Sequence, residues 1–415
     1  MSYNPESLVI KTLYIISRKE GKMAIRTVAK LLIVTFLAFG LVFLNPVAKA
    51  ESDTIKIGSF GAYSGFLSKY GDAQTQGIEL AIEDIEKSGG LLGKKIELIK
   101  ADHGMKPADA SRRLRRLVEK DQVNFVIGPQ SSGVASVITD IVEPAKVITN
   151  ITVAGHMVNV EKKCSKYVFK VSNDMEVFGK PFGEWVAKNL GKKIYILGQD
   201  YAAGHQWCEN FKAGVLKAGG QIVGHEYAPI KTADFAPFFG KIKASQPDVL
   251  AGFFAGPPAI NFVKQADAFG LKADMKFAYA GVVTTIDNIR AQGKSAEGIY
   301  TWFDFVEGST DPKYQAFAKR VQDKYKIEAW FAQFRAYIAT KSILEAVKRA
   351  NSLDPDKIVA EMEGKPIDTP LGDIYFNPGN HQVIMNYYVR KVKGGQNIVI
   401  DKVKDLRGTD RCEKF

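Results

Sequence analysis

The strongest constraint on the fold is the alternation of short apolar segments with longer amphipathic segments, which starts near residue 55 and continues along most of the chain. Segments 55–60, 95–101 and 123–127 have the composition of strands, and the last is continuously apolar, as in sheets buried on both faces. Segment 72–87 carries its apolar residues on one helical face. Strands that alternate with helices of about 10–15 residues predict βαβ units and therefore a parallel sheet.

The same pattern restarts further along the chain. A helix over 177–189 opens a second series, which ends with a strand at 277–280. A strand over 299–305 and helices over 312–325 and 331–350 follow, and the C-terminal segments have the pattern of antiparallel strands joined by glycine turns. A chain of 415 residues is too long for one hydrophobic core. Two series of βαβ units therefore predict two α/β lobes.

Residues 23–50 have the layout of a signal peptide. The cations Arg26 and Lys30 precede an apolar run over 31–44, and residues 48–50 form a small-x-small cleavage site. The alternative is an uncleaved membrane anchor, but the run is shorter than the roughly 20 apolar residues that a span needs. We expect cleavage after residue 50. No cysteine follows the cleavage site to carry a lipid, so the exported protein is expected to be soluble.

Residues 1–22 lack the layout of a signal peptide, and we interpret them as an upstream extension from a start codon placed too early. The net charge of the whole chain is +12. Its basic residues are scattered, apart from a cluster at 112–116 that we interpret as the solvated face of a helix over 107–120. We therefore expect no nucleic-acid partner.

Cysteine and histidine are few. The three cysteines are Cys164, Cys208 and Cys412, which permits one disulfide in an oxidising compartment and leaves one thiol. No CxxC pair occurs, and the five histidines have no metal-ligand spacing. We expect neither a metal nor another cofactor.

Two loops follow neighbouring strands of the first predicted sheet. Loop 128–133, with Ser131 and Ser132, comes after a buried strand and opens a helix over 131–146, and loop 152–156 ends the next strand. Ligands of parallel sheets bind at the carboxyl ends of the strands, and hydroxyls with free N–H groups at a helix start can hold an anion. The pattern predicts a carboxylate site flanked by Tyr70. Alternatively, one of these serines only caps the helix.

A serine hydrolase is the remote alternative. The sequence around Ser132 is not GxSxG, and His156 is the one nearby base that the loops supply. We expect no enzymatic activity.

Several motifs carry a family resemblance. They are IKIGSFGAYSG, NFVIGPQSSGVA, KCSKYVFKVS, DYAAGH and TPLGDIYFNPGNHQ, in this order along residues 53–405. The chain resembles the periplasmic type I solute-binding proteins of ABC importers, and within them the leucine/isoleucine/valine-binding branch. The resemblance implies an α/β fold of the periplasmic binding protein type I, with two doubly wound parallel-sheet lobes joined by a three-strand hinge. The implied lobes are 53–172 plus 305–373 and 173–304 plus 374–415.

The resemblance also implies a site in which the lobes clasp a small molecule by hinge closure. A serine and a nearby threonine of the family hold the ligand carboxylate, and His156 stands where that threonine is expected. Cys164 and Cys412 are expected to pair, with Cys208 as a buried thiol; the alternative pairing is Cys164 with Cys208. The implied ligand-binding residues are Tyr70, Gln130, Ser131, Ser132, Ala154 and His156 in the first lobe, and Tyr201, Ala203, Gly256 and Gly281 in the second.

The second lobe departs from the amino-acid binders of the family. Ala203 replaces an aromatic residue, the loop around Gly256 lacks an aromatic pair, and no acidic residue stands near Gly281 to neutralise a ligand ammonium. A buried ammonium without a counter-charge is costly. We therefore favour an aromatic or other apolar carboxylate over a branched-chain amino acid.

The implied partners are an inner-membrane ABC permease and its ATPase subunits, and the protein itself is expected to act as a monomer in the periplasm. A ligand sensor of the same fold that reports to a membrane receptor is the main alternative. Sequence does not separate transport from sensing.

Overall fold

The computed structural model describes residues 53–408, 410 and 412. Residues 1–53 and 54–415 fall into separate units, and the fold described below is that of the second unit. The predicted signal peptide at 23–50 and the upstream extension at 1–22 lie outside the described residues. No helix in the described part of the chain is both long and apolar enough to cross a membrane.

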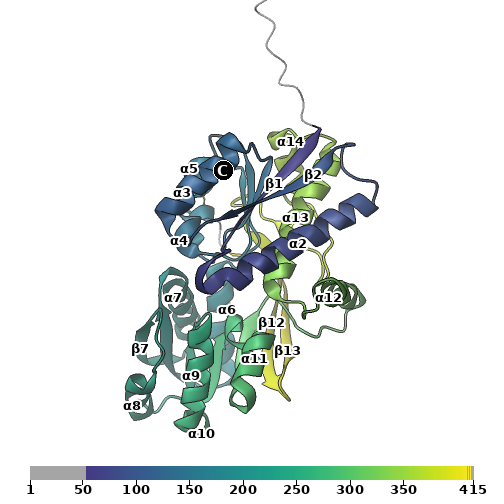
Figure 1. Cartoon of the computed structure of the whole chain (residues 1–415). Helices are drawn as coiled ribbons and strands as arrows, with labels where there is room; N and C mark the ends of the chain where they lie inside the picture. The colour runs from purple at the N-terminus through teal and green to yellow at the C-terminus, as the bar shows by residue number, and fades with distance from the viewer. Residues whose placement is uncertain (1–52, 409, 411, 413–415) are drawn as a thin grey trace, which may run out of the picture. The chain divides into compact units, whose positions relative to one another are not determined.

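The first lobe is built on a sheet of five parallel strands in the order β2-β1-β3-β4-β5 (Figure 1). Ile57 at the centre of the sheet pairs with Leu98 on one side and with Phe125 on the other. The strands are β1 (Thr54–Gly61), β2 (Lys95–Asp102), β3 (Phe125–Ile127), β4 (Ile148–Ile151) and β5 (Val168–Lys170). The helices that follow them in the chain are α2 (Ser68–Lys87), α3 (Pro107–Arg115), α4 (Ser132–Ala135) and α5 (Thr139–Val142).

The second lobe is built on an eight-stranded sheet in the order β11-β12-β10-β9-β8-β6-β7, with β13 paired to β12. Strands β6 to β10 run parallel, and the C-terminal strands pair antiparallel as predicted. The strands are β6 (Lys193–Asp200), β7 (Gln221–Pro229), β8 (Val249–Gly252), β9 (Lys276–Ala280), β10 (Tyr300–Phe303), β11 (Tyr375–Phe376), β12 (Val383–Lys393) and β13 (Gln396–Leu406). The helices are α6 (Met175–Asn189), α7 (Ala202–Lys217), α8 (Ala236–Ala244), α9 (Pro257–Ala268), α10 (Leu271–Asp274) and α11 (Ile286–Gln292).

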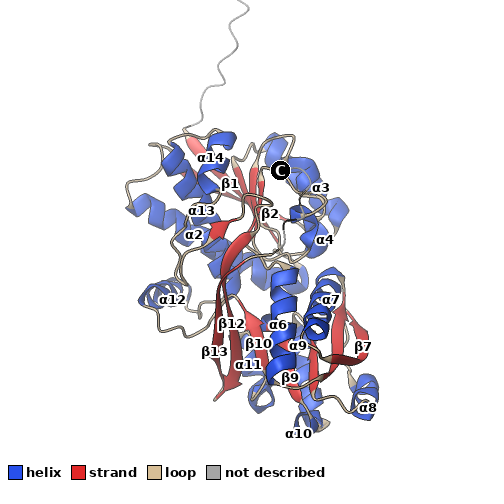
Figure 2. Ribbon diagram, turned by 180° about the vertical axis from the view of Figure 1, so that it is seen from behind, coloured by secondary structure: helices blue, strands red, loops and turns tan. Residues whose placement is uncertain are grey.

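Both sheets are covered on two faces, which is why strands such as β3 and β8 are apolar throughout. Opposite views place α6 on one face of the second sheet and α9 and α11 on the other (Figures 1 and 2). In the first lobe, Ile57 packs toward α2, whereas Val126 belongs to a separate cluster with residues of α3 to α5. The predicted doubly wound α/β fold with two lobes is confirmed.

The chain returns to the first lobe after β10. There it forms α12 (Pro312–Tyr325), α13 (Phe331–Ala350) and α14 (Pro355–Met362). Helix α13 packs along α2 and against β3 and β4 (Figure 1). The two helices approach closely at Gly77, where a Cβ atom would lie 2.2 Å from the carbonyl oxygen of Gln333. The chain then enters the second sheet again at β11, so three connections join the lobes.

One predicted element is wrong. Residues 131–146 were expected to form one helix, but the structure has the two short helices α4 and α5 with turns around them. Side chains from a following loop occupy carbonyl groups that a continuous helix would use. The Asn159 amide donates to the carbonyl of Ala135 at 2.9 Å, and the Lys163 ammonium donates to that of Ser136 at 3.1 Å.

A disulfide joins Cys164 to Cys412, with the Cα atoms 5.8 Å apart, which is the pairing that was expected. Cys164 lies between β4 and β5 in the first lobe, whereas Cys412 follows β13 of the second sheet. Cys208 is a free and fully buried thiol on α7, and burial raises its pKa. The C-terminal segment is therefore fastened to the first lobe.

Candidate functional site

A cavity of about 330 Å³ lies between the two lobes. Its walls include the loops that follow β3 and β4 in the first lobe and those that follow β6, β8 and β9 in the second, with α2, α6 and α13 completing it. Each of these loops begins at the carboxyl end of a parallel strand, where ligands of open α/β sheets bind. The volume lies in the range of small-molecule pockets. The lobes thus enclose a space suited to a small organic molecule.

Six of the ten predicted ligand-binding residues line this cavity. They come from both lobes and from three separate segments of the chain, so the fold brings them together as the strand-end argument requires. The six are Tyr70, Gln130, Ser131, Ser132, Tyr201 and Ala203.

Four predicted residues, Ala154, His156, Gly256 and Gly281, do not line the cavity in the described structure. Ala154 is fully buried, and its N–H and carbonyl groups bond to neighbouring segments. Gly281 lies against the Phe303 ring, and its carbonyl accepts from Arg390. In each case an adjacent residue lines the wall instead. The adjacent lining residues are Gly155, Ala255 and Val282.

The serine hydroxyls of the cavity wall are hydrogen-bond donors without a partner among the described residues. Neither Ser131 nor Ser132 forms a side-chain hydrogen bond with any other described residue, and Ser131 makes no capping bond to α4. The interpretation of these serines as mere helix caps is therefore wrong. Because α4 has only four residues, its dipole adds little, and the hydroxyl groups themselves are what can hold an anion.

Gln130 supports the wall from behind. Its side-chain oxygen accepts from the N–H of Ala62 at 2.8 Å, and its amide donates to the Gln74 oxygen at 2.6 Å. Gln74 in turn donates to Ser59 and to the carbonyl of Ile127. The Gln130 amide therefore fixes the loop that carries the serines, and its own polar atoms are already used.

Two tyrosines from opposite lobes line the cavity. The ring of Tyr70 packs against Trp330 and Phe331 of the first lobe, and that of Tyr201 packs 5.9 Å from Phe253 of the second. Burial raises the pKa of Tyr70 to about 12 and that of Tyr201 further. Both hydroxyls therefore stay protonated at neutral pH and can donate a hydrogen bond to a ligand.

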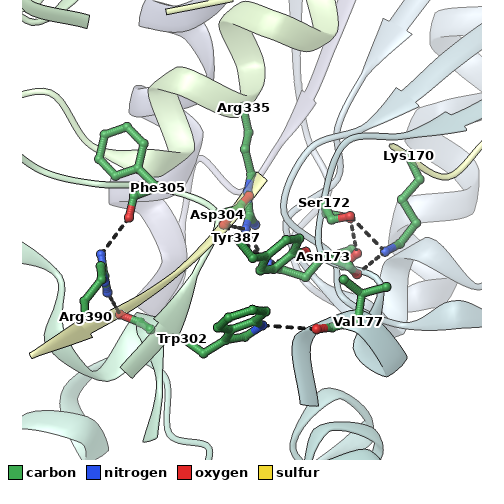
Figure 3. Close-up of polar contacts among 12 residues, drawn as sticks. Lys170, Ser172, Asn173, Val177, Trp302, Asp304, Phe305, Arg335, Tyr387 and Arg390 are labelled. Atoms are coloured by element: carbon green, nitrogen blue, oxygen red, sulfur yellow. Dashed lines mark hydrogen bonds and ion pairs between the residues drawn. The ribbon is translucent and has the colours of Figure 1, made fainter. Parts of the chain in front are cut away.

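Arg335 was missed by sequence reasoning. It is the one charged residue among the described residues that line the cavity, and its side chain is only 1% exposed. Its Nε donates to Asp304 at 2.9 Å, and its Nη2 donates to Asp304 at 2.6 Å and to Asn173 (Figure 3). A cation four residues after Phe331 on the buried face of a predicted helix was the signal that could have revealed it.

This network lies where the connections between the lobes meet. Asn173 follows β5, Asp304 follows β10, and Asn173 also donates to the hydroxyl of Tyr387 on β12 at 3.3 Å (Figure 3). Lys170 is fully buried in the same region and donates to the carbonyls of Ser172 and Asn173. Burial lowers the pKa of Lys170, an effect that Asp174 partly opposes. The hinge is thus polar inside and closely packed.

The arrangement does not resemble a hydrolytic site. In the described structure no hydrogen bond joins Ser132 to a histidine or a carboxylate, whereas a serine nucleophile needs an adjacent base. His156 is outside the cavity wall, and burial lowers its pKa, so it does not supply a cation either. No group of His, Cys, Asp or Glu within the described residues could hold a metal ion.

Comparisons with known proteins agree with this geometry. A family model described as periplasmic binding protein matches residues 54–397. A leucine-, isoleucine-, valine-, threonine- and alanine-binding protein of Pseudomonas aeruginosa is 26% identical over 329 residues, which cover 79% of this chain and 86% of the relative.

Two solved structures of solute-binding proteins from ABC transporters of Rhodopseudomonas palustris are also similar. One, from strain BisB5 in complex with 3,4-dihydroxybenzoic acid, is 28% identical with a TM-score of 0.80, over 86% of this chain and 99% of that one. The other, in complex with benzoate, is 25% identical with a TM-score of 0.80, over 87% and 99%. With its two doubly wound lobes and the cavity between them, the chain belongs to the type I periplasmic binding proteins, in the leucine/isoleucine/valine-binding family.

Proposed function

We propose that this protein is the periplasmic substrate-binding component of an ABC importer and that it captures an aromatic or other apolar carboxylate without an ammonium group. We take the lobes to be residues 53–172 plus 305–373 and residues 173–304 plus 374–415, and closure about the three connections encloses the ligand. An inner-membrane permease with its ATPase subunits receives the ligand from the monomeric protein.

The observation that carries the proposal is the charge of the cavity wall. The wall combines free serine and tyrosine hydroxyls with aromatic and aliphatic side chains, and its described residues include no Asp or Glu. A carboxylate finds hydrogen-bond donors there, and an apolar ring finds apolar contacts such as Phe178, Phe253 and Phe331. An amino-acid ligand would bury its ammonium without a counter-charge, beside the guanidinium of Arg335, which is unfavourable.

The similar solved structures with bound benzoate and dihydroxybenzoic acid support the same ligand class. The curated relative named for branched-chain amino acids supports the competing class, so the two must be compared directly.

Calorimetric titration of the mature protein with leucine, isoleucine, phenylalanine, benzoate and p-coumarate makes that comparison. We expect binding of the aromatic acids and weak or absent binding of leucine and isoleucine. Tight leucine binding with no response to the acids would refute the proposal. Uptake of labelled benzoate by cells with and without the gene tests transport, since a sensor would leave uptake unchanged.

A further inference from the structure

The environment of Arg335 influences which aromatic acids the cavity between the lobes can bind. Its guanidinium is held edge-on by both oxygens of Asp304, and two neighbouring aromatic rings pack on one side of it, with Cζ 5.3 Å from the centre of Phe303 and 5.0 Å from that of Phe331. Bidentate pairing and stacking together fix the orientation of an arginine. The side chain is therefore a rigid part of the wall.

The pair is electrically neutral as a unit. Arg335 and Asp304 are both essentially buried, at 1% and 0% side-chain exposure, and Asp304 itself does not line the cavity. Nε and Nη2 make all three hydrogen bonds to Asp304 and Asn173, so Nη1 takes no part in this network. The guanidinium of Arg335 therefore lines the cavity as a donor group whose charge is already balanced by the carboxylate of Asp304.

A balanced guanidinium selects among ligand groups by charge. A neutral oxygen, such as a hydroxyl, can accept a hydrogen bond there without disturbing the pair. A second carboxylate would be attracted by Arg335 and repelled by Asp304, so it would lose its hydration without a net counter-charge. An ammonium would face a donor group that cannot accept a hydrogen bond.

We propose that the Arg335–Asp304 pair is the specificity determinant of this cavity, and that the ligands are aromatic monocarboxylates with a neutral oxygen substituent, to the exclusion of dicarboxylates. The carboxylate of the ligand binds at Ser131 and Ser132, and its substituent binds at Arg335. This inference rests on the proposed function, because it refines the class of carboxylate that the same cavity accepts.

The test compares three ligands of one shape, which are benzoate, 4-hydroxybenzoate and terephthalate, by calorimetry on the full mature protein. The wild-type protein should bind 4-hydroxybenzoate at least fivefold more tightly than benzoate. It should bind terephthalate at least tenfold more weakly than benzoate. Equal affinities for 4-hydroxybenzoate and terephthalate would overturn the inference while leaving the proposed function intact. Absence of binding by all three would instead overturn the proposed function.

The variant Asp304→Asn sharpens the comparison, because it leaves Arg335 as an unbalanced cation. Terephthalate binding should strengthen at least tenfold relative to benzoate binding. If benzoate gains as much as terephthalate, the single carboxylate binds at Arg335 and the inference is wrong. Asp356→Asn makes the same chemical change at a residue outside the cavity wall and should leave all three affinities within twofold of wild type. Should Asp304→Asn fail to fold, the wild-type ligand ratios decide alone.

Discussion

Replacement of Ser132 by alanine is the sharpest test of where the ligand carboxylate binds. The Ser132 side chain is buried, at 8% exposure, yet its hydroxyl bonds to no other described residue, so its removal costs the free protein no internal hydrogen bond. The whole effect should therefore fall on ligand binding. A hydrogen bond to a charged group contributes about 1.5–3 kcal/mol, which corresponds to a rise in Kd of about 10- to 150-fold.

Calorimetric titration with benzoate measures the change in Kd, and thermal unfolding without ligand should show an unchanged Tm. Ser136→Ala is the matched control, because Ser136 lies outside the cavity wall and bonds to the carbonyl of Gly133 at 2.7 Å. The control should keep the wild-type Kd. If Ser132→Ala also binds benzoate within twofold of wild type, the carboxylate is not held by this hydroxyl and the assignment of the serine loop is wrong.

Three further outcomes follow from charges and bonds elsewhere in the protein. Burial lowers the pKa of His103 to about 4 from 6.5. Between these pH values the unfolded chain therefore binds more protons than the folded protein, and the free energy of unfolding should fall by up to about 3 kcal/mol as the pH drops from 6.5 to 4. Urea titrations of His103→Gln should show a smaller fall over the same pH range. An equally steep fall in the variant would contradict the assignment to His103. Reduction of the Cys164–Cys412 disulfide should lower the free energy of unfolding by about 2–5 kcal/mol in the same assay, and an unchanged value would contradict a structural role. The exposed ion pair of Lys69 and Asp287 joins α2 to α11 between the lobes. Because an exposed ion pair contributes little, Asp287→Asn should raise the Kd of the ligand no more than about fivefold. At about 1 M salt, which screens the pair, calorimetry should give the same Kd for the variant and the wild type. A difference that persists at that salt concentration would show that the effect is not electrostatic.

The long elements could be predicted because their signals are local. The helices at Pro312–Tyr325 and Phe331–Ala350 begin and end where the sequence pattern placed them, and the first is capped by Asp311. The short helix α11 at Ile286–Gln292 was missed, because seven residues carry too little periodicity to distinguish it from a loop. The break between α4 and α5 depends on Asn159, which is distant in sequence and invisible to a local pattern.

The site could be predicted where it follows strand ends. Ser131, Ser132 and Tyr201 each come directly after a strand or its loop, so topology alone places them at the cavity. Arg335 on α13 escaped prediction because its role depends on Asp304, which follows β10 in one of the connections between the lobes. Pairing across such distances becomes visible only when the fold is known.

The C-terminal segment places a limit on how far the lobes can separate. Strand β13 ends at Leu406 in the second sheet, and Cys412 is bonded to Cys164 in the first lobe. Six residues of fully extended chain span at most about 20 Å. The segment therefore acts as a strap of fixed length beside the three connections, and any opening that admits a ligand must fit within that length while the disulfide is intact.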